Sequence, residues 1–206
     1  MPQSPSDRSS GPRAPARSHG RRAFTIIETV FVLVIAGLMV ALAIPRIDSS
    51  KYRADAVAEI VRTTLQDAQR QAITRQHDMV VSFDTTGEQI RVLWDANDDG
   101  LISTGERTSF RGLDVGILFT DPSVKGVSGA SITKPVSGAA ISTLTGFPTV
   151  IFHRDGSVST DAEIYVSIAA RGPQKIYRAI TLTQATGRVD WYRLNTGNNK
   201  WVMANL

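Results

Sequence analysis

The stretch Arg21-Arg22-Ala23-Phe24-Thr25-Ile26-Ile27-Glu28 decides the fold of this chain, because a polar leader ends here and an apolar segment begins. The apolar run extends over residues 24–44, and its only polar members are Thr25, Glu28 and Thr29. Twenty-one residues at about 1.5 Å each form a helix of roughly 32 Å, close to the ~30 Å hydrocarbon core of a bilayer. The sequence therefore predicts a transmembrane helix over residues 24–44.

The leader, residues 1–23, carries most of the charge imbalance of the chain. Residues 1–20 are rich in Ser, Pro, Gly and Arg, so they bury too little apolar surface to fold and are predicted to be disordered. The leader holds five arginines and one aspartate, and without them the 23 basic and 19 acidic side chains fall to 18 of each. Arginines before an apolar helix keep that end in the cytoplasm, so the remainder is predicted to cross the membrane.

The boundary between Ala23 and Phe24 is the predicted cleavage point. An ordinary secretory signal is cut after its apolar stretch, whereas this boundary precedes it, so the apolar segment would stay in the mature protein. Glu28 supports this interpretation, because a carboxylate in a membrane helix costs roughly 2.5–3.5 kcal/mol and a simple anchor gains nothing from it. Cleavage would create an amino group on Phe24, one helical turn from Glu28 in its own or a neighbouring chain. Glu28 would then set the register in which neighbouring subunits assemble. The alternative interpretation is that the leader is not cleaved and the apolar segment serves only as a membrane anchor.

This arrangement resembles the amino terminus of type IV pilins and type II secretion pseudopilins. The resemblance implies cutting by a prepilin peptidase and methylation of the new amino terminus at Phe24. The glutamate of the family, four residues after that phenylalanine, matches Glu28, and its helix-kinking proline matches Pro45. Ala23 stands where the family usually has glycine.

An amphipathic helix is predicted over residues 45–75, because apolar side chains recur there at helical spacing. They are Val57, Val61, Leu65, Ala68 and Ala72. Alternating strands follow, and a Gly- and Ser-rich loop is expected near 123–148. The expected strands are 78–84, 89–94, 107–110, 116–119, 149–153, 163–168, 176–183 and 189–193. The predicted fold class is α+β: a long N-terminal helix packed on an antiparallel sheet, with the globular domain over residues 76–206.

Two later segments resemble the GspH/FimT minor pilins. Residues 149–159 resemble the strand, Asp-Gly turn and strand of that family, and residues 179–189 resemble its closing hairpin. The resemblance implies a minor subunit of a type II secretion pseudopilus or a type IV pilus. Its partners would be other pilins, bound through the N-terminal helix, the prepilin peptidase, the inner membrane and the assembly machinery. Its location would be the bacterial inner membrane, as a single-pass protein with a periplasmic domain, and then the filament.

Residues 95–106 fit the calcium-loop pattern of an EF-hand, with Gly100 at the sharp turn. The predicted ligands are Asp95, Asn97, Asp99, Leu101, Ser103 and Glu106. The flanks are predicted strands rather than helices, so a polar hairpin loop in which these residues only make turns is the alternative. Ca²⁺ is the candidate ligand of this loop, and the pilin-like function requires no cofactor.

The C-terminal segment combines cations with aromatic rings, which is typical of surfaces that bind single-stranded or duplex DNA. The predicted contacts are Arg188, Trp191, Arg193 and Lys200. FimT-type pilins that act in DNA uptake carry Gly-Arg-x-Arg here, whereas this chain has Asp190 in place of the second arginine. Packing of the rings on the sheet, with solvated charges, is the alternative.

No catalytic pattern is found in the sequence. The chain has no cysteine, which excludes disulfides, thiolate metal sites and cysteine nucleophiles. Its three histidines are scattered, and no nucleophile elbow or phosphate-binding Gly-Lys loop is present. The sequence therefore predicts a protein that is not an enzyme.

Overall fold

The computed structural model of the chain describes residues 25–43, 49–97, 106–143, 145–169 and 175–204. The chain divides into two compact units, Met1–Ile47 and Asp48–Leu206. Ala23, Phe24 and Pro45 lie outside the described residues. The predicted proline kink, and the continuity of one long helix through it, therefore stay predictions.

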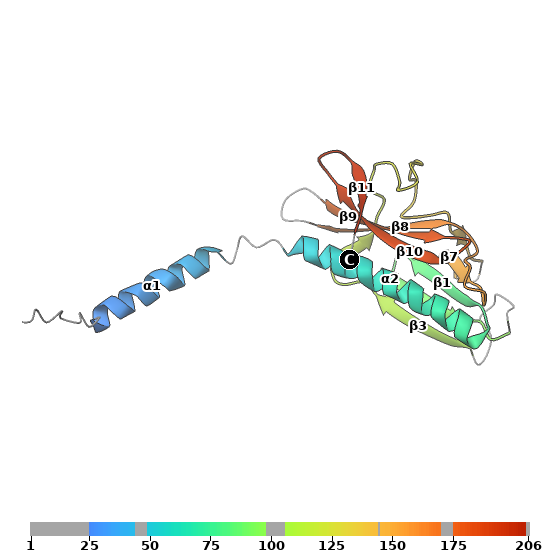
Figure 1. Cartoon of the computed structure of the whole chain (residues 1–206), viewed down its shortest axis with the longest axis horizontal. Coiled ribbons are helices and arrows are strands. Elements are labelled where there is room, and N and C mark those ends of the chain that lie inside the picture. Colours follow the sequence, from blue (N-terminus) through green and yellow to red (C-terminus); the bar gives the residue numbers. More distant parts are fainter. Residues whose placement is uncertain (1–24, 44–48, 98–105, 144, 170–174, 205–206) are drawn as a thin grey trace, which may run out of the picture. The chain divides into compact units, whose positions relative to one another are not determined.

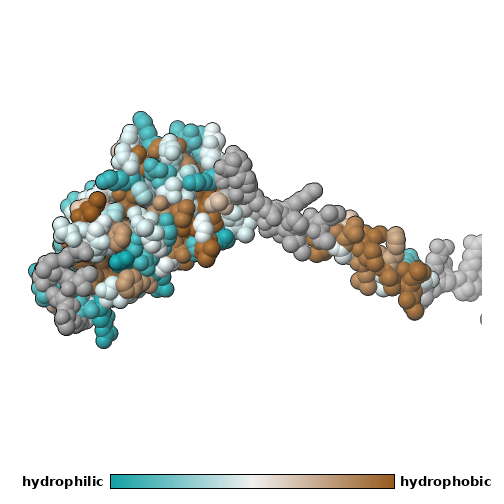
Figure 2. Space-filling view, turned by 180° about the vertical axis from the view of Figure 1, so that it is seen from behind, coloured by the Kyte–Doolittle hydropathy of each residue, from teal (hydrophilic) through white to brown (hydrophobic). Residues whose placement is uncertain are grey.

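Helix α1, Ile26–Ala43, forms within the predicted apolar segment. Its described side chains, up to Val40, are exposed, and Ile26 is 86% exposed. Hydrophobic residues dominate its surface (Figure 2). No helix in the part of the chain that the structure describes is both long and apolar enough to cross a membrane.

Helix α2, Ser50–Arg75, confirms the amphipathic helix predicted before the strands. All five predicted apolar positions are buried, and two further alanines, Ala54 and Ala58, extend the stripe. Small side chains along the stripe let the helix axis approach the sheets closely. The helix ends at Gln76, which adopts a left-handed conformation with φ of 59° and so stops the helical hydrogen bonding.

Eleven strands are described, and every strand pair is antiparallel, as predicted. They form two sheets rather than the one expected. The first sheet, in spatial order, contains β3 (Arg107–Gly112), β2 (Gln89–Trp94), β1 (Met79–Asp84), β7 (Pro148–Phe152) and β6 (Ala140–Ile141). The second contains β11 (Lys200–Met203), β10 (Arg188–Asn195), β9 (Lys175–Thr183), β8 (Ala162–Ala169) and β4 (Ile117–Phe119), and β5 (Val136–Ser137) also pairs with β8.

Helix α2 packs against both sheets, contacting β1 and β7 of the first and β8, β9 and β10 of the second. Figure 1 shows it running along the strands from one end of the domain to the other. Its stripe meets large side chains such as Phe83 and Ile90 from the first sheet and Ile164 and Ile180 from the second, all fully buried. Burial of this shared apolar surface is the main stabilising contribution to the domain.

Two predicted segments differ from the structure, and one strand has no predicted counterpart. The second strand expected after the Asp-Gly turn is reduced to one bridge between Phe152 and Val158, because the chain then crosses to the other sheet at β8. The expected loop 123–148 contains β5, β6 and a bridge between Lys125 and Ser131. Strand β11 was not expected. The closing hairpin is confirmed as β9 and β10.

Candidate functional site

The amino-terminal end of α1 is the first candidate site, because Glu28 lies in its first turn. The backbone amide of Glu28 donates to Thr25 Oγ1 at 3.3 Å, so Thr25 caps the helix. Thr25-x-x-Glu28 is the capping-box pattern, which is a sequence signal for a helix that starts directly after Thr25. A carboxylate in the first turn is also favoured by the helix dipole. Glu28 therefore has a local role in starting α1, besides the assembly role predicted for it.

The apolar surface of α1 is the second feature. Phe31 and Leu33 are 64% and 66% exposed, and Leu38 and Met39 are 63% and 69% exposed, so apolar side chains face outward around the helix. Soluble proteins rarely leave so much contiguous apolar surface in water. This surface is suited to burial in a lipid bilayer or against other helices.

The stripe of α2 is different, because its own domain covers it. Val61 and Leu65 have no exposed surface, and Ala72 has none. The polar side of α2 reaches neighbouring turns: Gln69 Nε2 donates to the carbonyl oxygens of Gly156 at 2.7 Å and Thr186 at 2.9 Å. Helix α2 is therefore a structural part of the globular domain, and α1 carries the unsatisfied apolar surface.

A cluster of three charged side chains joins the start of α2 to β9 and β10. Asp55 Oδ1 accepts from Arg178 Nε at 2.6 Å, and Asp55 Oδ2 accepts from Arg193 Nη2 at 3.0 Å. Arg178 is 4% exposed, and its burial lowers the pKa of the guanidinium, an effect that the Asp55 carboxylate opposes. Asp55 thus holds a buried arginine in place, and Arg193 shares the same carboxylate.

The residues predicted to bind DNA do not form one open surface. Trp191 is 6% exposed and belongs to the core, so the prediction that its ring stacks on bases is wrong. Arg188 pairs with Asp190 at 2.8 Å, and Arg193 pairs with Asp55. Lys200 is exposed at the start of β11. DNA binding itself stays a prediction, without the aromatic contact on which it partly depended.

The calcium-loop prediction falls partly outside the described residues, which exclude Asp99, Leu101 and Ser103. The flanks are strands β2 and β3, paired from Trp94 with Arg107, so the element is a hairpin as expected. Glu106 Oε1 accepts from the amide of Ala96 at 3.2 Å, and Asp95 is 2% exposed. Across the described parts of the chain, no group of three or more His, Cys, Asp or Glu side chains is arranged to hold a metal ion. Calcium binding stays a prediction.

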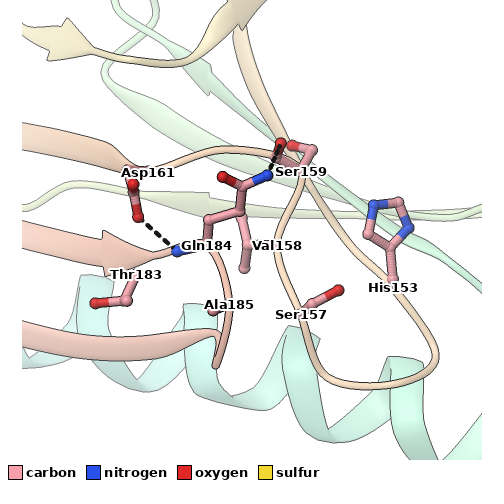
Figure 3. A pocket seen from close by; sticks show the side chains of 8 residues that line it. All are labelled: His153, Ser157, Val158, Ser159, Asp161, Thr183, Gln184 and Ala185. Atoms are coloured by element: carbon pink, nitrogen blue, oxygen red, sulfur yellow. Dashed lines mark hydrogen bonds between the residues drawn. The ribbon is translucent and has the colours of Figure 1, made fainter.

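One pocket lies between the Asp155-Gly156 turn and the end of β9 (Figure 3). Its polar groups hold these segments together: the amide of Gln184 donates to Asp161 Oδ1 at 2.6 Å, and Gln184 Nε2 donates to the Ser159 carbonyl at 3.2 Å. Figure 3 shows Thr183 and His153 on opposite sides of the pocket, so its side chains do not converge on one point. The two hydrogen bonds of Gln184 join the end of β9 to the segment before β8.

Comparison with protein-family models and with curated proteins gives no match. Among solved structures, the chain resembles the minor pseudopilin EpsH from the type 2 secretion system of Vibrio cholerae at 15% identity and a TM-score of 0.43, over 68% of this chain and 97% of that one. A second structure of that pseudopilin gives 17% identity and a TM-score of 0.38, over 68% and 92%. The type IV minor pilin FimU of Pseudomonas aeruginosa gives 14% identity and a TM-score of 0.40, over 68% and 89%. By their descriptions, these structures are minor pseudopilins and a minor pilin.

Proposed function

We propose that this chain is the precursor of a minor pilin or pseudopilin of the GspH/FimT type, a subunit of a type IV pilus or of a secretion pseudopilus. The observation that carries the proposal is the order of the N-terminal features. A leader with several arginines is followed by Ala23 and Phe24, by a glutamate four residues later, and by an apolar helix whose surface is exposed. The role is structural and not catalytic.

Assembly would proceed through α1. The prepilin peptidase would cut between Ala23 and Phe24, and the new amino group at Phe24 would be methylated. The apolar segment 24–44 would hold the subunit in the inner membrane, with its globular domain in the periplasm. Glu28 would pair with the amino group of Phe24 in its own or a neighbouring subunit, and this charge pair would set the register of helices in the filament.

The division of apolar surface between the two helices supports this pathway. The stripe of α2 is covered by the sheets of the same domain, whereas the described side chains of α1 are exposed. Helix-to-helix packing in a filament would therefore use α1, and the domain that contains α2 would keep its fold throughout. Other subunits and the assembly machinery are the expected partners.

The intact mass and N-terminal sequence of the protein, extracted from membranes of its native cells, test this proposal. We expect a chain that begins at Phe24 and is heavier by one methyl group. Ala23→Gly restores the residue usual in the family and serves as the positive control, while Ala23→Leu places a bulky side chain at the cut and should leave the precursor intact. A wild-type chain that still carries residues 1–23, beside an Ala23→Gly variant that is processed, would contradict the proposal.

A further inference from the structure

The start of α2 carries an exposed surface with cationic and apolar side chains. It consists of Lys51, Tyr52, Arg53, Val115 and Lys175, and we call it the α2-start surface. Tyr52 is 76% exposed and Val115 is 87% exposed. Arg53 Nη2 donates to the Val115 carbonyl, which ties the segment before β4 to the first turn of α2.

Strand β9 also begins at this end of the domain. Arg178, near its start, donates from Nη2 to the Lys51 carbonyl at 3.5 Å. Lys175 is the first residue of β9 and is exposed. Two aspartates at this end are paired, Asp114 with Arg53 at 3.0 Å and Asp55 with Arg178 and Arg193, and Asp121 lies near Tyr177. The exposed lysines therefore leave this surface with a positive character.

The geometry of a helix start directs these side chains. In an α-helix each Cα–Cβ bond is tilted toward the N-terminus, so side chains of the first turn lean past the beginning of the helix. Lys51, Tyr52 and Arg53 lie in the first turn of α2. They therefore lean toward the side from which the chain enters the domain.

The length of the chain limits how far this surface can lie from a membrane. Residues 45–49 separate the predicted membrane segment from Ser50. Five residues span at most about 18 Å, whatever their conformation. This step rests on the proposed function, in which segment 24–44 is inserted in the bilayer. An inserted subunit then keeps the α2-start surface within reach of the lipid headgroups.

We propose that the α2-start surface contacts anionic lipid headgroups while the subunit is held in the membrane. Tyrosine is enriched at membrane interfaces, because its ring is apolar and its hydroxyl group is polar. Lysines and arginines beside a membrane segment are attracted to anionic headgroups. The contact fixes the orientation of the domain on the membrane before the subunit enters a filament.

The chain has no cysteine, so a single introduced cysteine can carry a fluorescent label. The two variants are Val115→Cys, in the α2-start surface, and Ala185→Cys, in the exposed turn after β9. That turn is held to α2 at Gln69, sixteen residues along the helix from Arg53. Each full-length labelled chain is placed in nanodiscs that contain a lipid with a quencher on its headgroup, made with or without phosphatidylglycerol.

We expect quenching at position 115 to exceed quenching at position 185 by about threefold in anionic discs, and to fall by about half in neutral discs. Replacing Lys51 and Lys175 by glutamine should have the same effect as neutral lipid. Equal quenching at the two positions, or quenching at 115 that ignores lipid charge, would overturn the inference. A chain that does not co-elute with the discs would instead overturn the membrane anchoring of the proposed function.

Discussion

At the scale of single residues, Gln69 joins the two turns that resemble the GspH/FimT family. One side-chain amide donates to the carbonyl oxygens of Gly156 and Thr186, one from each turn. Gln69→Leu removes both hydrogen bonds and keeps the side-chain volume similar. We expect the free energy of unfolding to fall by about 1–2 kcal/mol, because two partly covered acceptors lose their donor. Thermal or urea unfolding measures the difference.

The control for Gln69 is Gln66→Leu on the same helix. Gln66 is half-buried, as Gln69 is, so the two substitutions remove comparable amounts of polar surface. A loss of stability equal in the two variants would show that the bonds to the turns contribute nothing of their own.

The contact between Gln69 and the two turns also requires glycine at position 187. Its φ is 62°, and a Cβ at this position would lie 2.2 Å from Gln69 Nε2 and 2.3 Å from the Gly156 carbonyl oxygen. Gly187→Ala therefore combines backbone strain with a collision. Gly129 has a φ of 85° and open space around it, so Gly129→Ala experiences the strain alone.

We expect Gly129→Ala to destabilise the fold by about 1 kcal/mol and Gly187→Ala to cost more than about 2 kcal/mol. Unfolding experiments on the two variants side by side give the comparison. Equal costs would mean that the hairpin turn can move away from α2 freely. The glycine before Arg188 is thus explained by packing on the helix, independently of any DNA contact.

At the scale of elements, the β1–β2 hairpin is closed by Asp84. Burial alone would raise the pKa of this carboxyl group, but hydrogen bonds from Gln89, Gly87, Arg91 and Thr86 outweigh it and lower the pKa from 3.8 to about 2. A pKa that is lower in the folded state stabilises the fold at pH values above the unfolded pKa. That contribution is lost as the pH falls from about 4 to about 2.

Asp84→Asn should therefore lower the midpoint of thermal unfolding at pH 7, and the difference from the wild type should shrink toward zero near pH 2. The loss at pH 7 should be about 1.5–3 kcal/mol, as for a hydrogen bond to a charged group. Asp67→Asn is the control, because Asp67 forms an exposed pair with Arg70 that contributes little. A pH-independent effect of Asp84→Asn would show that the charge is not what stabilises the hairpin.

The elements also show how far the sequence predicts this fold. The spacing of Val57, Val61 and Leu65 identified the buried face of α2, and alternation identified β1 and β2 with bounds within one residue. Alternation indicates which face of a strand is buried but not which strand lies beside it, so the division into two sheets was missed. Strand β11 is short and follows a polar turn, and its place depends on pairing with β10. Trp191 is predicted to contact DNA but lies in the core. The sequence does not separate these cases, because an aromatic residue beside arginines suits a core strand as well as a nucleic-acid surface.

At the scale of the whole molecule, the hydrophobic core formed by the described residues lies entirely in the second compact unit. The described side chains of α1 contribute none of it. A protein built in this way can transfer its N-terminal helix from one apolar environment to another without unfolding its domain. The fold thus separates the helix that is proposed to assemble from the domain that contains the described core.

A chain that begins at Asp48 should therefore fold by itself, remain monomeric without detergent, and unfold within about 2 °C of the full chain, because it keeps the complete core and loses no core packing.

A chain that begins at residue 56 is the matched comparison. It loses the first turn of α2 with the buried Ala54, and it loses Asp55, which leaves Arg178, 4% exposed, without its carboxylate. A buried charge without a partner costs about 3–5 kcal/mol, so this shorter chain should unfold at a much lower temperature. Circular dichroism during heating, with size-exclusion chromatography before it, separates the two results. If the chain from Asp48 proved as unstable as the chain from residue 56, residues 1–47 would be part of the folded core, and the two units could not act independently.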